Sequence, residues 1–212
     1  MNILVIGASR GIGLATVKQA LSAGHRVRAL ARSAQRIDIR HEGFEAYAGD
    51  ALDQKTIEGA LEGVDAVVQA LGVPLDQKLL TGPISLFSKA TEMLTPAMEA
   101  AGVKRLISVT GFGAGESRAA ISPLERLPFL AVFGRAYDDK SRQEDLIKAS
   151  ALDWTIVRPG VLTNGRQTQK YRVLINSSDW RNGVISRGDV AHFILRQLED
   201  PTLVGAAPVI VR

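Results

Sequence analysis

Residues 2–25, NILVIGASRGIGLATVKQALSAGH, place three glycines between an apolar run and an amphipathic stretch. The apolar run predicts a buried strand, and residues 12–23 predict a helix. A turn that joins a strand to a helix so tightly needs residues without a Cβ, here Gly7, Gly11 and Gly13. The backbone N–H groups at the start of such a helix point out of the turn, where the helix dipole favours an anion. The stretch therefore predicts a phosphate-binding turn of an α/β fold.

The rest of the chain repeats the alternation of apolar runs and helical patterns. Strands are expected at residues 2–7, 26–32, 44–49, 65–71, 105–111 and 154–160, and helices at 12–23, about 53–62, about 86–101, about 135–150 and about 188–199. Several runs are almost continuously apolar, which is typical of strands covered on both faces. Repeated strand–helix–strand units predict a doubly wound parallel sheet with helices on both faces, in one domain over residues 1–212. The last helix is expected to begin at Ser186 or Asp189 as its cap.

Two stretches rich in glycine and proline interrupt this alternation. Residues 72–85 are expected to be a loop after the fourth strand, and residues 111–134 a second, longer loop. Long loops in compact domains are often functional. The apolar part of the second, ISPLERLPFLAVFG, either covers a site, packs against a second subunit, or forms a surface loop with a short buried helix. We expect a small substrate-side region formed by about 111–134 and 160–186.

Composition excludes several classes of function. The chain has no cysteine, which excludes disulfides, thiolate metal sites and cysteine nucleophiles. Its net charge of +4 is scattered and its aromatic content is 5%, so no nucleic-acid partner is expected. No leader and no apolar stretch of about 18 residues are visible, so we expect a cytoplasmic protein without a membrane partner. His25, His41 and His192 are far apart in the sequence, and we predict no metal site.

The residues beside the glycine turn indicate which dinucleotide it would hold. Ser9 can donate its hydroxyl to a phosphate. An acidic residue ends the second strand when the ribose carries a free 2′-hydroxyl, but here Arg32 and Ser33 stand there, and Asp38 is the next acid. With Arg10 inside the turn, two guanidiniums are placed to pair with a 2′-phosphate. NADP(H) is therefore preferred over NAD(H), unless Arg32 is merely solvated.

Two further strand ends are consistent with a bound dinucleotide. Asp50 and Ala51 follow the third strand, where a carboxylate could meet the adenine amino group, although Asp50 could equally cap the next helix. Ala70, Leu71 and Gly72 follow the fourth strand and offer a small, apolar path. Together with Ile12 at the start of the first helix, these residues complete the cofactor contacts expected from the strand ends.

Four segments together resemble a known family. They are GASRGIG at 7–13, AGD at 48–50, ALG at 70–72, and DKSRQEDLIKASALDWTIVRPG at 139–160. The chain resembles, over essentially its whole length, the atypical short-chain dehydrogenases/reductases. It is most similar to the NAD(P)H-binding branch with NmrA-like proteins and flavin/biliverdin reductases. The resemblance implies a Rossmann-like fold, bound NADP(H) and reduction of a small conjugated or carbonyl substrate.

The resemblance also implies roles for individual residues. Lys140 would contact the ribose, and Pro159, Gly160 and Val161 would line the nicotinamide pocket. Thr110 falls where many relatives carry the serine or threonine of the active site. Arg158, which precedes Pro159, could meet an anion or pair with a neighbouring acid.

Tyr137 departs from the family pattern. Standard members pair a tyrosine with a lysine four residues on, whereas Tyr137 precedes Lys140 by three and Ala136 stands at the usual position. Positions 137, 140 and 144 share a helical face, but a shift of one residue rotates the phenol by about 100°. Tyr137 is therefore either a general acid beside Lys140 or a buried structural residue. The catalytic candidates are Thr110, Tyr137 and Lys140.

Three functions fit these features. The first is an NADPH-dependent oxidoreductase that transfers hydride to a small aromatic or carbonyl acceptor, such as a flavin-, quinone- or biliverdin-like molecule. The second is a non-catalytic, NADP(H)-sensing regulatory protein of NmrA-like type, which the displaced tyrosine would allow. The third is a sugar-nucleotide epimerase or dehydratase. We favour the first because hydride transfer to an electron-poor ring needs alignment more than a strong acid. The partner is then a small molecule, and the protein a monomer or homodimer.

Overall fold

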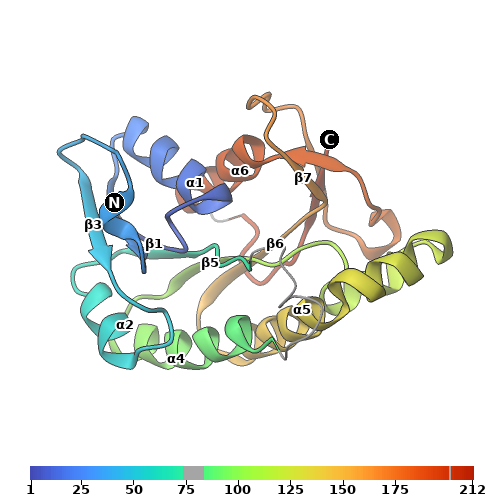
Figure 1. Ribbon diagram of the computed structural model, residues 1–212, viewed down its shortest axis with the longest axis horizontal. Helices are drawn as coiled ribbons and strands as arrows, with labels where there is room; N and C mark the ends of the chain where they lie inside the picture. The colour runs from blue at the N-terminus through green and yellow to red at the C-terminus, as the bar shows by residue number, and fades with distance from the viewer. Residues whose placement is uncertain (74–83, 201) are drawn as a thin grey trace.

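The computed structural model describes residues 1–73, 84–200 and 202–212. At its centre lies an eight-stranded sheet of order β3-β2-β1-β4-β5-β6-β10-β8 (Figure 1). Its strands are β1 Asn2–Ile6, β2 Arg26–Ala31, β3 Phe44–Ala48, β4 Ala66–Gln69, β5 Arg105–Val109, β6 Asp153–Pro159, β8 Arg172–Leu174 and β10 Val209–Val211. All neighbours pair in parallel except β8, which is antiparallel to β10. The doubly wound sheet is confirmed, with one antiparallel strand added at its edge.

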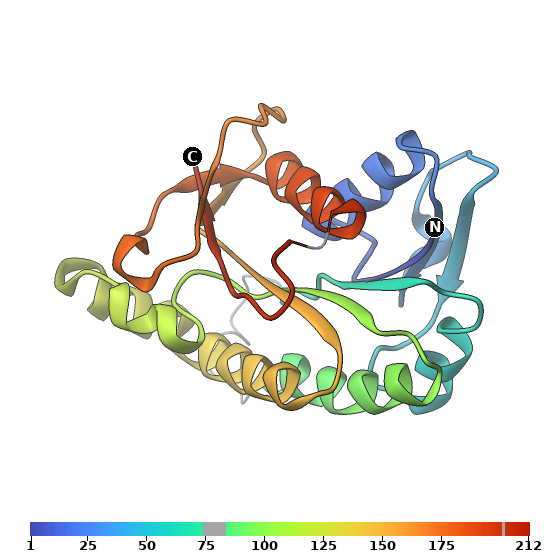
Figure 2. The same cartoon turned by 180° about the vertical axis from the view of Figure 1, so that it is seen from behind.

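Helices cover both faces of the sheet, as Figures 1 and 2 show from opposite sides. One layer consists of α1 Gly11–Ser22 and α6 Arg187–Glu199, and the other of α2 Gln54–Ala60, α4 Leu86–Ala100 and α5 Pro123–Ala149. Short 3₁₀ turns are η1 Ala34–Arg36, η2 Gly115–Ala120 and η3 Ser177–Asp179. Within the described ranges, no helix is both long enough and apolar enough to cross a membrane.

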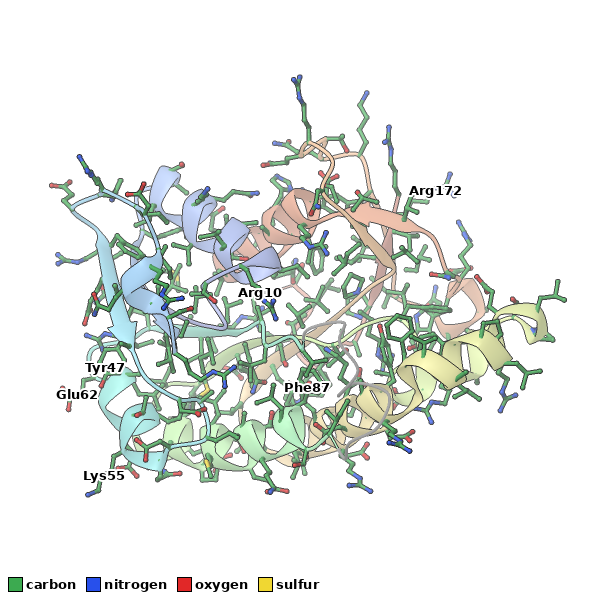
Figure 3. The ribbon with its side chains drawn as sticks, in the orientation of Figure 1. Arg10, Tyr47, Lys55, Glu62, Phe87 and Arg172 are labelled. Carbon is green, nitrogen blue, oxygen red and sulfur yellow. The ribbon has the colours of Figure 1, made fainter. Side chains whose placement is uncertain are left out.

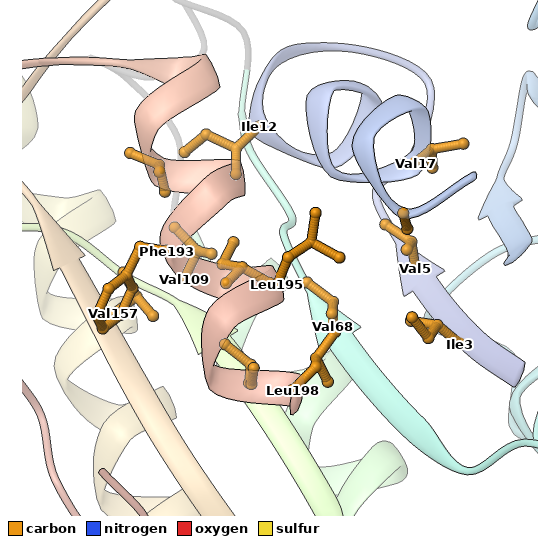
Figure 4. Packing of buried hydrophobic residues seen from close by; sticks show 14 of the residues in the cluster. Ile3, Val5, Ile12, Val17, Val68, Val109, Val157, Phe193, Leu195 and Leu198 are labelled. Carbon is orange, nitrogen blue, oxygen red and sulfur yellow. The ribbon is translucent and has the colours of Figure 1, made fainter. Parts of the chain in front are cut away.

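Two apolar layers hold the helices to the sheet. Figure 4 shows the first, in which Phe193 and Leu195 of α6 pack against Val68 of β4 and Val109 of β5. The second layer packs α2, α4 and α5 against the opposite face, around residues such as Leu106. A fully buried aliphatic side chain contributes about 1.5–3 kcal/mol. The strands are apolar on both faces because each face meets a helix layer.

Two helix caps resolve alternatives that the sequence left open. Ser186 is the N-cap of α6, and its hydroxyl oxygen accepts from the Asp189 N–H at 2.9 Å. Asp53, not Asp50, caps α2 through a bond from the Thr56 N–H at 3.1 Å. Asp50 instead accepts from the backbone N–H of Leu52 at 3.0 Å. Asp50 therefore stays at the carboxyl end of β3.

The prediction of a loop over residues 111–134 is wrong for its second half, because α5 begins at Pro123. Proline is well suited to the first position of a helix, where the missing N–H has no partner to lose. Proline usually ends a helix, but Pro128 lies inside α5. Because it has no N–H, the helix lacks one backbone hydrogen bond there. The first turns of α5 extend beyond the sheet in both views (Figures 1 and 2) and leave Leu124 92% exposed. The loop proper ends at residue 122.

Other expectations differ in detail. The loop expected at 72–85 lies for the most part outside the described residues. The sequence missed β8 and β10, and also β7 Val161–Thr163 and β9 Val184–Ser186, which form a separate parallel pair. Each of these strands has three residues. Such runs are too short to carry a periodic signal, and tertiary pairing decides them.

Candidate functional site

A cleft of about 1400 Å³ opens at the carboxyl edge of the sheet. It crosses the point between β1 and β4 at which the strand order reverses. In open α/β sheets, this is where ligands bind. The cleft extends from the ends of β2 and β3, past the glycine turn, to α5 and the segment after β6.

The structure brings nearly all of the predicted site residues together in this cleft. It is lined by Gly7, Ser9, Arg10, Gly11, Ile12, Arg32, Ser33, Asp50, Ala51, Ala70, Leu71, Gly72, Thr110, Tyr137, Lys140, Pro159, Gly160 and Val161. Gly13 is the predicted residue that does not line it. The sequence analysis did not name the lining residues Phe112, Phe129, Phe133, Glu125, Asn164, Asn182 and Arg187 individually. All of them except Arg187 fall within the substrate-side region expected from about 111–134 and 160–186, and three of them, Glu125, Phe129 and Phe133, lie on α5 where a loop was expected.

The glycine turn is shaped by close backbone contacts. Gly7 has φ +86, and a Cβ there would lie 2.6 Å from the Ala70 carbonyl oxygen. A Cβ on Gly13 would lie 2.2 Å from the Gly7 carbonyl oxygen, so Gly13 holds α1 against β1 from outside the cleft. In the described chain, no side chain caps α1 and its first turn contains no acid. Its N–H groups and positive dipole end are therefore available to an anion.

Basic residues flank the turn where β1 and β2 end. Figure 3 labels Arg10 at the start of α1, and Arg32 and Ser33 follow β2 in the same cleft. Neither Arg10 nor Arg32 forms an ion pair within the described residues. Asp50 lines the cleft on the β3 side. This end can therefore bind phosphate through guanidiniums and an amino group through a carboxylate.

Lys140 meets the end of β5. Its Nζ donates to the Thr110 carbonyl oxygen at 2.8 Å and to that of Val109 at 3.4 Å. The same atom stands 4.3 Å from the centre of the Phe87 ring. Burial lowers the pKa of Lys140 to about 8, although the negative charges of Glu144 and Asp139 act to raise it. At neutral pH the lysine is therefore mostly protonated, and it brings a positive charge to the cleft.

Tyr137 reaches the same part of the cleft despite its spacing from Lys140. Its hydroxyl lies over Gly111, where an added Cβ would be 2.5 Å away. Its ring packs edge-on against Phe129, with ring centres 4.7 Å apart. Burial raises the pKa of Tyr137 to about 12. The phenol is thus a weaker acid than an ordinary tyrosine, and both interpretations of Tyr137, acid or structural, remain predictions.

A charge cluster of Arg158, Glu144 and Glu116 lies next to Thr110. Arg158 and Glu144 have no exposed side-chain surface, and the Arg158 Nη2 donates to Glu144 Oε2 at 2.5 Å. Arg158 also contacts Glu116, and its guanidinium stands 5.0 Å from the Trp180 ring centre. Desolvation acts to lower the pKa of Arg158, but hydrogen bonds and charge from Glu144 and Glu116 raise it. Of the two alternatives for Arg158, the structure selects pairing with an acid.

Glu144 also fixes the hydroxyl of Thr110. Thr110 Oγ1 donates to Glu144 Oε1 at 2.7 Å, while Arg158 Nε donates to the same oxygen at 3.0 Å. An ionised carboxylate can only accept, so the Thr110 proton points away from the cleft, towards Glu144. Thr110 therefore presents oxygen lone pairs, not a donor, to a ligand.

Aromatic side chains line the far end of the cleft. Phe112, Phe129 and Phe133 join Tyr137 there. At the rim, Asn182 Nδ2 donates to Glu125 Oε1 at 2.9 Å and links the start of α5 to the segment before β9. Flat, apolar walls of this kind suit a planar aromatic ligand. No three His, Asp or Glu side chains of residues 1–73, 84–200 and 202–212 gather closely enough to bind a metal ion.

Comparisons with known proteins agree with this geometry. A family model described as NAD(P)H-binding matches residues 7–201. The chain is 28% identical to the photosystem II assembly factor Ycf39 of Synechocystis, over 94% of this chain and 59% of that protein. It is 30% identical to the NAD(P)H azoreductase of Xenophilus azovorans, over 74% of this chain and 47% of that protein.

A solved structure gives a match over the whole chain. The anaerobillin reductase ChuY from Escherichia coli O157:H7 superposes with a TM-score of 0.82 at 26% identity, covering 100% of this chain and 97% of that chain. By contrast, the chain spans only 41–59% of the length of the first three curated relatives it matches.

Proposed function

Because the chain belongs to the NAD(P)H-binding family, whose model matches residues 7–201, we propose that it is an NADPH-dependent oxidoreductase with a small, planar aromatic acceptor. One observation carries the proposal. A single cleft joins an arginine-flanked glycine turn at one end to a set of aromatic rings at the other, with Thr110 and Lys140 between them. An anion-binding end and a ring-binding end in one cleft fit a dinucleotide and an acceptor stacked beside it.

The cofactor end would hold NADP(H) through groups that the fold already positions. The N–H groups at the start of α1 would bind the pyrophosphate, and Arg32 with Arg10 would bind the 2′-phosphate. Asp50 would accept from the adenine amino group. When bound, NADPH supplies the hydride that an acceptor takes up.

The residues between the two ends would orient the acceptor and do little acid chemistry. The Thr110 hydroxyl donates a hydrogen bond to Glu144, and the pKa of Tyr137 is raised to about 12. Neither is a strong donor towards a developing alkoxide. An electron-poor ring needs alignment with the cofactor, and water can supply its proton. A flavin- or quinone-like acceptor is therefore favoured over an aliphatic ketone or aldehyde.

Turnover with a panel of acceptors tests the proposal. We expect the purified protein to oxidise NADPH, followed by loss of absorbance of the reduced cofactor, when riboflavin or menadione is supplied. Hexanal should give slower turnover or none, because it offers no ring to the aromatic end of the cleft. Tight NADPH binding without turnover of any acceptor would contradict an enzyme.

Replacing Arg32 should change the choice of cofactor. Arg32→Ala is expected to weaken NADPH binding by about 10- to 100-fold, the size of a lost charge-assisted hydrogen bond, while NADH binding stays the same. Calorimetry with both cofactors measures this. Arg36→Ala is the matched control, since Arg36 is exposed nearby but does not line the cleft. Equal weakening of NADPH and NADH in Arg32→Ala would refute the assigned contact.

A second function, an NADP(H)-sensing regulatory protein, is favoured by one observation. The tyrosine hydroxyl lies over Gly111 and burial raises its pKa to about 12, which makes Tyr137 a weaker acid than an ordinary tyrosine. The acceptor panel separates the two functions. A sensor would bind NADPH tightly and leave every acceptor unreduced.

A further inference from the structure

Arg187 lies beside the start of the helix that begins with Gly11. It is the first residue of α6, it is half-buried, and it lines the cleft. Its Nε would lie 3.9 Å from a Cβ placed on Gly11, so the guanidinium faces the glycine turn itself. α6 is fixed at this end because Gln19 of α1 donates to the Gly188 carbonyl oxygen at 2.9 Å. The position of Arg187 is therefore set by the packing of α6 on α1.

The guanidinium is also held in orientation. Arg187 Nη1 donates to Asn164 Oδ1 at 2.7 Å, and Asn164, after β7, lines the same cleft. A neutral amide directs the arginine without compensating its charge. Across the part of the chain that the structure covers, no carboxylate forms an ion pair with Arg187.

The nearest acid on the same helix is already occupied. Asp189 Oδ1 accepts from the N–H groups of Thr168 and Gln169, each at 2.7 Å. Its Oδ2 accepts from Ser186 Oγ at 2.8 Å and from Thr168 Oγ1 at 3.1 Å. The carboxylate and Ser186 complete the start of α6 internally, so Arg187 is not needed there.

Two positive features thus lie close together in the cleft. The start of α1 contributes its N–H groups and dipole, and Arg187 contributes a full charge from α6. Without an anion between them, this arrangement is repulsive. A bound anion could accept hydrogen bonds both from the backbone N–H groups and from the guanidinium.

We propose that Arg187 binds the pyrophosphate of the dinucleotide and holds it against the glycine turn from the α6 side. The position along the cleft selects this group. Arg32 and Ser33 lie at the end of β2, where the 2′-phosphate is expected, whereas Arg187 lies at Gly11 and next to the segment after β7. The inference rests on the proposed function, since it presupposes that a dinucleotide binds.

Its test uses the fact that NADPH and NADH share the pyrophosphate. Arg187→Ala is expected to weaken both by the same factor, about 10- to 100-fold, measured by calorimetry on the full chain. Binding of 2′-AMP, which has no pyrophosphate, should not change. Arg166→Ala is the matched control, because Arg166 is exposed in the segment after β7 that carries Asn164, lies outside the cleft lining, and its loss removes the same charge.

A second variant keeps the Arg187 side chain and compensates its positive charge. Asn164→Asp would set a carboxylate where Oδ1 now stands, 2.7 Å from Arg187 Nη1, and so compete with the phosphate. We expect it to weaken NADPH and NADH equally, as Arg187→Ala does. Thermal unfolding of both variants near the wild-type midpoint verifies that the fold is kept.

The remaining outcomes overturn the inference in distinguishable ways. Unchanged affinity of Arg187→Ala for both dinucleotides would show that Arg187 does not contact the cofactor. Loss for NADPH alone would place it at the 2′-phosphate, and a loss confined to the KM of the acceptor would place it at the substrate. If the wild-type protein binds neither dinucleotide, the proposed function itself fails.

Discussion

Glu144→Gln is expected to lower the free energy of unfolding by about 3 kcal/mol, a value near the lower end for breaking a buried ion pair. Arg158 is fully buried and cannot lose its proton, so without the carboxylate its charge stays in the interior uncompensated. Glu116 still contacts Arg158, which keeps the loss from being larger. Urea unfolding at 25 °C, followed by circular dichroism, measures the change.

Two further variants make this prediction specific. Glu92→Gln removes the same charge from an exposed position of α4 and should leave stability almost unchanged. Glu144→Leu combined with Arg158→Met removes both charges and should destabilise much less than the sum of the single changes. If Glu144→Gln unfolds at the wild-type urea concentration, the buried pair does not contribute as described.

Gly13→Ala is expected to damage both stability and cofactor binding. The added Cβ would stand 2.2 Å from the Gly7 carbonyl oxygen, so α1 must move away from β1. Overpacking of this kind costs roughly 1–3 kcal/mol. The N–H groups at the start of α1 move with the helix, and we expect NADPH affinity to fall at least about tenfold, equivalent to about 1.4 kcal/mol. Thermal unfolding and calorimetry report the two effects separately.

Gly134→Ala is the matched control for this change. Gly134 also lies inside a helix, α5, but the nearest atom to its added Cβ is 3.9 Å away. Alanine is the better helix former by about 1 kcal/mol, so this variant should be as stable as the wild type or more so. If Gly13→Ala has the stability and the NADPH affinity of the wild type, the close packing of the turn is needed for neither.

Much of the fold could be predicted because its signals are local. The apolar run before Gly7 and the helix pattern after Gly13 predicted β1 and α1 to within one or two residues. The same alternation predicted the first six strands, and the confirmed sheet follows because continuously apolar strands need helices on both faces. The strand-end residues from Arg10 to Val161 gather in one cleft because parallel strands end on one edge.

The sequence misled where a local signal had two meanings. Pro123 and Pro128 read as loop residues, but one starts α5 and the other is tolerated within it. The tyrosine spacing predicted a rotated phenol, yet Tyr137 still reaches Gly111 at the end of β5. The packing of α5 against the strand ends decides where the Tyr137 side chain points, and the spacing between Tyr137 and Lys140 does not predict that direction.

The sequence by itself determined the glycine turn, the alternation of the first six strands with helices, and the edge of the sheet at which a ligand would bind, because each depends on residues close together in the chain. Only the tertiary structure decided that Glu144 faces Arg158, that phenylalanines from two segments line one end of the cleft, and that Arg187 faces Gly11. Such pairs join residues far apart in the sequence. Their contacts depend on how α5 and α6 pack on the sheet, and no local pattern encodes that packing.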